Sequence, residues 1–215
     1  MGMEPIYILG VGHNTINIIE LALDCGYEIG GLIHFNESRT GEIYFGYPII
    51  GSYEKFLTPE FIRGKNVTLS MGDLKIKDNL FKELKDLGAF LPTLIHPSSH
   101  ISRFCKIGYG VQIQAQCIIE GDSIISDNTT VVVNTVIHHN SYIGYNNLIS
   151  GNVIIGAYCN IGDFVHIGQG AVVVSGKVGA IGDNSILGAG SVLLSDMPAN
   201  SVYVGNPAKL LKFRN

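Results

Sequence analysis

An aliphatic residue recurs at every sixth position through the second half of the chain. In steps of six from Ile95, every position up to Val173 holds isoleucine or valine. The register then slips by two residues between Gly176 and Gly179. It resumes at Ile181, Leu187 and Leu193. A period of six is wrong for a helix, and a unit of this length holds one short strand and one turn.

Three such units, about 18 residues, predict one triangular coil with an aliphatic side chain pointing inward at each face. The stretch 95–193 therefore gives between five and six coils. Glycine often follows the repeat residue, as in Ile107-Gly108 and Ile143-Gly144. Glycine or asparagine is expected to supply the left-handed turn conformation that other residues adopt at a cost. Each coil would stack only on its neighbours, as in a parallel β-helix.

The first half of the chain has a different pattern. It predicts a short buried strand over 5–9, a glycine turn, an amphipathic helix over 14–25 and a second strand over 28–35. A further strand over 67–71 and a helix over 75–87 follow. A strand, a glycine turn, a helix and a second strand are typical of a Rossmann-like start. We therefore expect an α/β Rossmann-like domain at 1–93 and an all-β domain with a C-terminal tail at 94–215.

The glycine turn resembles a dinucleotide-binding fingerprint only in part. Gly10-Val11-Gly12 is followed by Thr15 where the third glycine would stand, and no acid cleanly follows the second strand. One interpretation is a phosphate or nucleotide docked at the helix N-terminus, where free N–H groups and the helix dipole favour anions. The other is a small structural domain without a ligand.

Composition narrows the function classes. The chain has 215 residues, of which 46% are hydrophobic and 15% charged, so a sizeable core is possible. A net charge of −4 and a pI near 5.9 give no general attraction to nucleic acid. No apolar run approaches the roughly 18 residues of a membrane span or resembles a signal peptide. Four scattered cysteines suit a reducing cytosol, so we expect a cytoplasmic protein.

Several motifs together resemble one family. They are the Gly-x-Gly-His start, the Ile95-His96-Pro97 segment, a histidine in the middle of the repeats and the terminal segment from Val204 to Lys209, which reads Val-Gly-Asn-Pro-Ala-Lys. The combination resembles the NeuD/PglD-type sugar acyltransferases, among them the N-acetyltransferases of UDP-bacillosamine and perosamine precursors. The resemblance covers nearly the whole chain.

The resemblance implies a function and an assembly. The β-helix would be left-handed, against the usual rule for crossover connections. The protein would transfer an acetyl group from acetyl-CoA to a nucleotide-linked amino sugar in bacterial surface-glycan biosynthesis. It would be a homotrimer with active sites between neighbouring β-helices, and no metal would be needed.

The resemblance also implies catalytic residues. In the family a histidine and then an acid precede an Ile-Gly pair, and here this pattern places the base at His139 and the acid's position at Asn140. An asparagine cannot raise the basicity of the imidazole by charge, although its carbonyl can orient the ring. The neighbouring His138 is a second candidate, and the double histidine leaves the assignment open.

The family's binding residues map onto two groups of positions. For the nucleotide sugar they fall on Gly10, Gly12, His13, Phe35, Asn36, Gly72 and Lys75. For acetyl-CoA they fall on Leu148, Gln169 and Ala189. The family has a polar residue where Leu148 stands. The missing acid near Phe35 leaves open whether the nucleotide is a UDP, GDP or dTDP.

The remaining histidines are weaker candidates. His96 and His100 are four residues apart, but Pro97 and the β context exclude the helical geometry of a metal pair. His34 follows a strand and is either a ligand contact or part of a rim. His166 lies on the β-helix as a surface or interface residue.

Two other functions fit the same motifs. One is O-acetylation of a sialic acid or similar sugar, because nothing in the sequence distinguishes an amine from a hydroxyl acceptor. The other is a non-catalytic scaffold that has lost its base, and Asn140 is the feature that favours it. Acyl groups other than acetyl also stay open.

Overall fold

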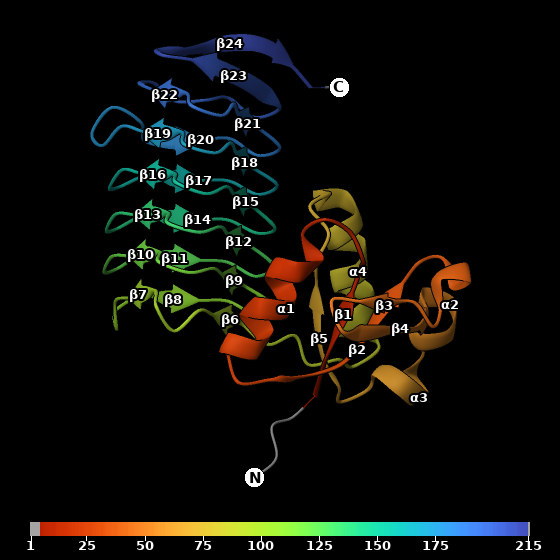
Figure 1. Ribbon diagram of the computed structural model, residues 1–215. Helices are drawn as coiled ribbons and strands as arrows, with labels where there is room; N and C mark the ends of the chain where they lie inside the picture. Colours follow the sequence, from red (N-terminus) through yellow and green to blue (C-terminus); the bar gives the residue numbers. More distant parts are fainter. Residues whose placement is uncertain (1–4, 215) are drawn as a thin grey trace. The chain divides into compact units, whose positions relative to one another are not determined.

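The computed structural model describes residues 5–214, which divide into two compact units between Leu94 and Ile95 (Figure 1). The first unit is an α/β unit built on one sheet. The second is a stack of short strands. Among the described residues, no helix is long and apolar enough to cross a membrane.

The sheet of the first unit has the strand order β3-β4-β2-β1-β5. Its strands are β1 (Pro5–Leu9), β2 (Glu28–His34), β3 (Ile43–Tyr44), β4 (Tyr47–Ser52) and β5 (Asn66–Leu69). All neighbouring pairs are parallel except the short β3–β4 hairpin. The helices are α1 (Thr15–Asp24), α2 (Tyr53–Phe56), α3 (Pro59–Ile62), α4 (Leu74–Asp86) and the 3₁₀ turn η1 (Glu37–Arg39).

Helix α1 packs its apolar side on this sheet. Ile18 and Ile19 of the helix are buried against Ile8 of β1 and Leu32 of β2. The predicted strands and helices of this unit are present, with ends that differ by at most two residues. The sequence did not predict β4, because Pro48 and Gly51 in it are typical of turns and edges.

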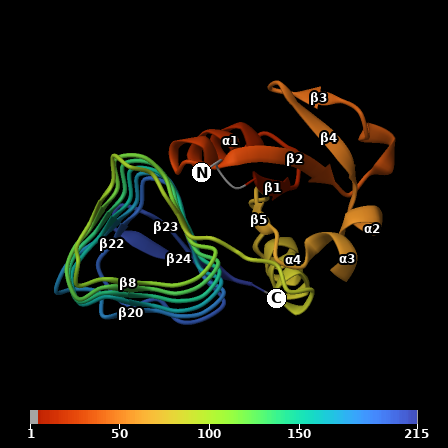
Figure 2. The ribbon, with the colours of Figure 1, turned by 90° about the horizontal axis from the view of Figure 1, so that it is seen from below.

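The second unit is a parallel β-helix with three faces, seen end-on as a triangle in Figure 2. The first face holds β7 (His100–Ile101), β10 (Ile118–Ile119), β13 (Val136–Ile137), β16 (Ile154–Ile155), β19 (Val172–Val173) and β22 (Val192–Leu193). The second face holds β8 (Lys106–Ile107), β11 (Ile124–Ile125), β14 (Tyr142–Ile143), β17 (Asn160–Ile161) and β20 (Ala180–Ile181). The third face holds β6 (Leu94–Ile95), β9 (Gln112–Ile113), β12 (Thr130–Val131), β15 (Leu148–Ile149), β18 (His166–Ile167) and β21 (Ile186–Leu187).

The repeat residues form the core of this unit. Each two-residue strand ends on the predicted aliphatic position, and Ile137, Ile143 and Ile149 are fully buried, one on each face. The longer turn between Val173 and Ile181 accounts for the slip of register. The regular stack of parallel strands confirms a parallel β-helix, and its left hand stays a prediction from the resemblance.

Asparagine and glycine both supply the left-handed conformation in the turns of the β-helix, as the sequence predicts. The φ angle is 58° at Asn134, 57° at Asn140 and 69° at Gly170. The glycine that directly follows a repeat residue has a different role, because its φ is not positive. These glycines are needed because the next coil passes too close for a side chain: a Cβ at Gly168 would lie 2.5 Å from the amide nitrogen of Ala189.

Buried hydroxyls connect successive coils. The Thr129 hydroxyl donates to the carbonyl of Gly144 at 2.9 Å and accepts from the amide of Asn147 at 3.1 Å. The Ser141 hydroxyl donates in the same way to the carbonyl of Gly156 at 3.1 Å. These bonds satisfy polar groups inside a narrow core, where an unpaired group would cost free energy.

The tail extends the third face. Strand β23 (Ser201–Gly205) pairs in parallel with β21, and β24 (Ala208–Phe213) folds back antiparallel on β23. A cis peptide bond joins Asn206 and Pro207 in the turn between them. The Val-Gly-Asn-Pro-Ala-Lys motif therefore forms the hairpin that ends this sheet.

Candidate active site

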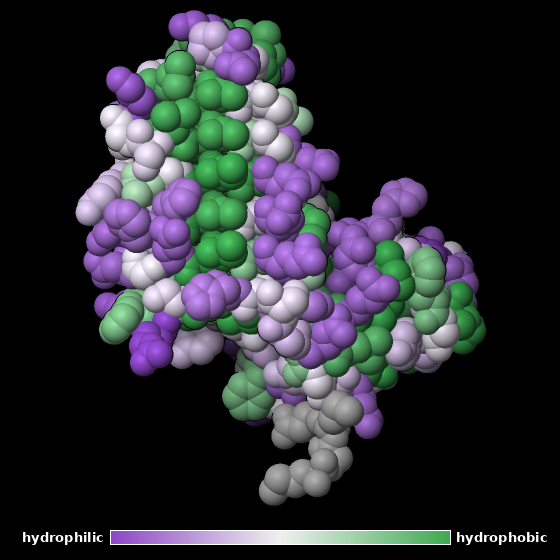
Figure 3. Space-filling model, turned by 60° about the vertical axis from the view of Figure 1, so that its left-hand side comes forward, coloured by the Kyte–Doolittle hydropathy of each residue, from purple (hydrophilic) through white to green (hydrophobic). Residues whose placement is uncertain are grey.

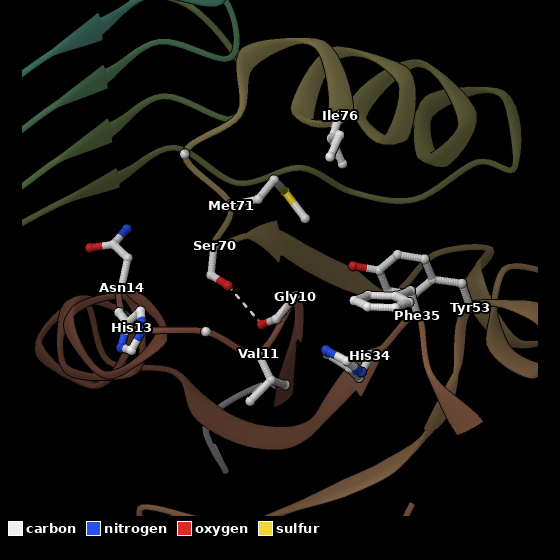
Figure 4. A pocket seen from close by; sticks show the side chains of 12 residues that line it. Gly10, Val11, His13, Asn14, His34, Phe35, Tyr53, Ser70, Met71 and Ile76 are labelled. Carbon is white, nitrogen blue, oxygen red and sulfur yellow. Dashed lines mark hydrogen bonds between the residues drawn. The ribbon is translucent and has the colours of Figure 1, made fainter. Parts of the chain in front are cut away.

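A cavity of about 650 Å³ lies at the carboxyl ends of the parallel strands in the first unit (Figure 4). In parallel α/β sheets this edge is the usual place for a ligand. The lining residues lie at the ends of β1, β2, β4 and β5, in the turns after these strands or in the first turns of the following helices. They are Gly10, Val11, Gly12, His13, Asn14, His34, Phe35, Tyr53, Ser70, Met71, Gly72 and Ile76.

The glycine turn is held from inside by two hydroxyl groups. The amide of Gly12 donates to the Thr15 hydroxyl at 2.9 Å, and the Ser70 hydroxyl donates to the carbonyl of Gly10 at 2.7 Å. The two hydroxyl oxygens are 3.0 Å apart. Thr15, which replaces the third glycine of the fingerprint, therefore closes the turn onto the end of β5.

The two glycines of this turn tolerate a side chain differently. Gly10 has φ of +91°, and a Cβ there would lie 3.0 Å from the Met71 side chain. No heavy atom lies within 4 Å of a Cβ built on Gly12. Because Gly12 also lines the cavity, a side chain at this position would project into space that a ligand could use.

Two of the predicted nucleotide-sugar residues lie beside the cavity and do not line it. The Asn36 side chain accepts from the amide of Ser38 at 3.0 Å and caps η1. Lys75 is in the first turn of α4, where its amide donates to the carboxylate of Asp73 at 2.9 Å. Gly10, Gly12, His13, Phe35 and Gly72 all line the cavity.

Two more polar side chains line this cavity: His34, which is buried, and Tyr53, which is half-buried. Nδ1 of His34 accepts from the amide of Asn36 at 3.1 Å, so a neutral ring carries its proton on Nε2. Burial lowers the pKa of His34, and the charge of Arg39 lowers it further, which favours that neutral ring. Burial raises the pKa of Tyr53 to about 12, so its hydroxyl stays protonated. Tyr53 directly follows β4, the strand that the sequence did not predict.

In the β-helix, both catalytic candidates lie in the turn between β13 and β14, at the edge between the first and second faces. Nδ1 of His139 is 2.8 Å from Oδ1 of Asn140. The Asn140 amide in turn donates to the carboxylate of Asp122 at 2.6 Å. His139 is exposed, and its ring packs edge-on against Tyr158 with centroids 5.3 Å apart.

The neighbouring histidine has a carboxylate of its own. Nδ1 of His138 lies 3.0 Å from Oε2 of Glu120, which also accepts from the amide of His139 at 3.1 Å. The hydrogen bond from His138 holds the pKa of the Glu120 carboxyl below its usual range. Below, the histidine corner means Glu120, Asp122, His138, His139 and Asn140. Its two acids, Glu120 and Asp122, come from the preceding coil, and neither follows the histidines in sequence.

The three residues expected to bind acetyl-CoA lie elsewhere on the β-helix. Leu148 points outward from the third face between Thr130 and His166. Gln169 and Ala189 lie in exposed turns at the edge between the third and first faces. The histidine corner lies at the opposite edge of the first face, between β13 and β14. A single copy of the β-helix does not bring the two sets together.

The first face carries an outward column of aliphatic side chains, which forms the continuous green stripe in Figure 3. Its members stack from coil to coil through the parallel pairing of this face. They are Ile118, Val136, Ile154, Val172 and Val192. Below we call this column the aliphatic stripe.

The remaining histidines have local partners. Nδ1 of His96 is 2.8 Å from the Ser98 hydroxyl, and Nε2 of His166 is 3.2 Å from the Ser150 hydroxyl. Burial lowers the pKa of His166, with a smaller effect from Arg214. Within residues 5–214, no group of histidine, cysteine or acidic side chains is placed to hold a metal ion.

No protein-family model and no curated protein matches this sequence. Solved structures do. The acetyltransferase domain of PglB from Neisseria gonorrhoeae FA1090, in complex with acetyl coenzyme A, is 27% identical with a TM-score of 0.86. The match covers 98% of this chain and 100% of that one.

Two more distant structures share the fold. PerB from Caulobacter crescentus, in complex with CoA and GDP-perosamine, is 24% identical with a TM-score of 0.71 and 97% of each chain covered. A point mutant of AntD, an N-acyltransferase from Bacillus cereus in complex with dTDP and coenzyme A, is 22% identical with a TM-score of 0.51. That match covers 62% of this chain and 89% of that one. The resemblance predicted from the sequence motifs is confirmed by these structures.

Proposed function

We propose that the protein is an acetyl-CoA-dependent N-acetyltransferase of a nucleotide-linked amino sugar of the UDP-bacillosamine or GDP-perosamine type. The observation that carries the proposal is the similarity, over nearly the full length of both chains, to the PglB acetyltransferase domain bound to acetyl coenzyme A. The CoA and GDP-perosamine of the more distant PerB structure support the same class of substrates. A cytoplasmic place in bacterial surface-glycan biosynthesis follows from such substrates.

The first unit, 1–93 in our assignment, is proposed as a Rossmann-like domain that binds the nucleotide sugar. The cavity at the carboxyl ends of its parallel strands supports this role. Gly10, Gly12 and His13 would face the diphosphate at the start of α1, where the helix dipole favours an anion. Phe35, Asn36, Gly72 and Lys75 would contribute further contacts at the rim.

The β-helix, 94–215 in our assignment, is proposed as the acyltransferase domain, with His139 as the general base. The sugar amine attacks the thioester carbonyl, and Nε2 of His139 takes the proton that the amine loses as the C–N bond forms. A backbone N–H would stabilise the oxyanion until the C–S bond breaks and CoA leaves as the thiol after protonation. His138, paired with Glu120, is the alternative base.

We further propose a homotrimer in which two copies form each active site. His139 and the proposed acetyl-CoA residues, Leu148, Gln169 and Ala189, do not meet within one β-helix. The aliphatic stripe between those edges is an apolar surface of the kind that subunit interfaces cover. A neighbouring copy packed there would place its own edge with Gln169 and Ala189 beside the histidine corner, in a closed cyclic assembly.

A thiol-release assay tests the proposed activity. The protein is incubated with acetyl-CoA and a panel of UDP-, GDP- and dTDP-linked 4-amino sugars, each beside its 4-hydroxy counterpart, and products are identified by mass spectrometry. We expect acetylation of an amino sugar and none of the hydroxy counterpart. Transfer to the hydroxy sugar alone would identify an O-acetyltransferase. Absence of both transfer and acetyl-CoA binding would overturn the proposal in favour of a scaffold.

A further inference from the structure

The orientation of the Asn140 amide determines what His139 can do. A carboxylate only accepts hydrogen bonds, so the NH₂ group of Asn140 must face Asp122, at 2.6 Å. The amide oxygen then faces Nδ1 of His139, at 2.8 Å. An oxygen accepts only from a protonated nitrogen, so Nδ1 carries the proton. The lone pair of a neutral ring is therefore on Nε2.

We propose that Asp122 is a positioning residue that acts on His139 through Asn140. It fixes the amide, the amide fixes the tautomer of the ring, and Nε2 is thereby kept free to accept a proton. This inference rests on the proposed function with His139 as the base. It also gives a physical account of the asparagine that stands where an acid is expected: the acid is present, but it comes from the preceding coil, 18 residues earlier.

Other turns of the same β-helix show how the Asn140–Asp122 pair differs from its equivalents. Asn134 donates to Asn152 at 2.7 Å and Asn128 to Asn146 at 2.8 Å, each across one coil. Such amide pairs hold neighbouring turns together, and their direction can reverse if both amides flip. With Asp122 as the acceptor the direction cannot reverse, because a carboxylate has no proton to give.

The carboxylate has a second effect on the same ring. When His139 takes a proton at Nε2, positive charge develops over both ring nitrogens. The Asn140 amide, polarised by the carboxylate behind it, presents its negative end to that charge. A cysteine protease triad uses an asparagine against its histidine in a similar way. In this protein the asparagine is in turn held by an acid.

The tautomer can be measured without turnover. We would label the protein with ¹⁵N-histidine and record ring ¹⁵N shifts at a pH where the imidazole is neutral, with the His139 signals assigned from their loss in His139→Gln. The wild type should show a protonated Nδ1 and an unprotonated Nε2. Asp122→Asn keeps the shape but frees the amide to flip, so the two forms should mix. Asn134→Asp, the reverse exchange at an equivalent turn position, should leave the His139 shifts unchanged.

A swap of the two side chains sharpens the test. In Asn140→Asp alone, the new carboxylate would lie where the Asn140 amide is now 2.6 Å from the Asp122 carboxylate. The repulsion between the two negative charges disfavours this contact. In the double variant Asp122→Asn/Asn140→Asp, the new amide can donate to the new carboxylate, which then accepts directly from Nδ1. We expect the double variant to show the Nδ1-protonated form alone, whereas Asp122→Asn mixes it with the other tautomer.

Kinetics complete the experiment. Asp122→Asn should lower kcat by less than loss of the base itself, which costs about 10²–10⁴-fold, with both KM values unchanged. The double variant should regain most of the lost rate. A wild-type tautomer in Asp122→Asn would overturn the role of Asp122. A wild type without transferase activity whose tautomer still depends on Asp122 would overturn the proposed function and leave this positioning role standing.

Discussion

Nδ1 of His138 lies 3.0 Å from Oε2 of Glu120, one residue before the histidine that pairs with Asn140. The two adjacent imidazoles thus have different partners: His138 has a direct carboxylate, and His139 has an amide. Either arrangement can hold Nδ1 protonated and leave Nε2 as the acceptor. Mutation of each histidine in turn is therefore needed to tell which of the two is the base.

We expect His139→Ala to lower kcat by about 10²–10⁴-fold with little change in either KM, the usual contribution of a general base. His138→Ala, the adjacent matched variant, should be nearly silent. Steady-state thiol release by both variants is the measurement. If His138→Ala is inactive and His139→Ala works, the base is His138 with Glu120 as its partner.

The sequence predicted the β-helix well because its core is a repeat. Each inward position is set by one residue type at one spacing, and the burial of Ile137 and its equivalents follows directly. Strand β4 was missed because Pro48 and Gly51 look like turn residues, although tertiary contacts with β2 make the segment a strand. With it Tyr53 was missed, and that residue lines the cavity.

The partners of the histidine corner were missed for a different reason. A search for an acid directly after the histidine reaches only Asn140. Contacts between coils join residues one full coil apart, so Glu120 and Asp122 face His138 and Asn140 across the stack. The period of the repeat already contained this signal, because a step of one coil back from Asn140 ends on Asp122.

A substitution at the glycine turn tests the nucleotide-sugar cavity. Gly12→Val should raise the KM for the nucleotide sugar strongly, because the new side chain fills space where phosphates would approach. The fold should be kept, since no heavy atom lies within 4 Å of the new Cβ. Thermal unfolding and the KM for acetyl-CoA are the controls, and both should match the wild type. An unchanged nucleotide-sugar KM would place the ligand elsewhere.

The acetyl-CoA groove has a matched pair of alanines. Ala189→Trp should weaken acetyl-CoA binding, because a large side chain in this exposed turn would fill the proposed groove. Ala115 occupies the same turn position in an earlier coil, two residues after Ile113 as Ala189 is two residues after Leu187. Ala115→Trp should leave acetyl-CoA affinity unchanged in calorimetric titrations. Equal acetyl-CoA affinities for both variants would show that the groove lies on another part of the β-helix.

The buried His34 makes stability depend on pH. Burial, aided by Arg39, lowers its folded pKa below the value near 6.5 of an unfolded chain. As the pH falls below about 6.5, the unfolded state therefore binds more protons, and the free energy of unfolding decreases. His34→Gln removes this contribution.

The comparison between wild type and variant isolates His34, because the lowered pKa of His166 acts in the same direction in both proteins. Urea unfolding at pH 8 and pH 5.5 is the measurement. Acidification should destabilise the wild type more than His34→Gln. The same loss in both proteins would show that His34 is not the group responsible.

The last prediction concerns the aliphatic stripe. Ile154 lies at its centre and is 41% exposed, while Ile124 on the second face is 38% exposed. If neighbouring copies pack on the first face, Ile154→Glu places a charge in an apolar contact with no partner, and the trimer should dissociate. Ile124→Glu adds the same charge at a similarly exposed isoleucine, and the trimer should persist.

Light scattering gives the mass of each variant, and circular dichroism shows that both stay folded. Since His139 and Ala189 lie at opposite edges of that face, the dissociated variant should also lose acetyl transfer. A wild type that is monomeric at working concentration, or an active monomeric Ile154→Glu, would rule out a site shared between copies.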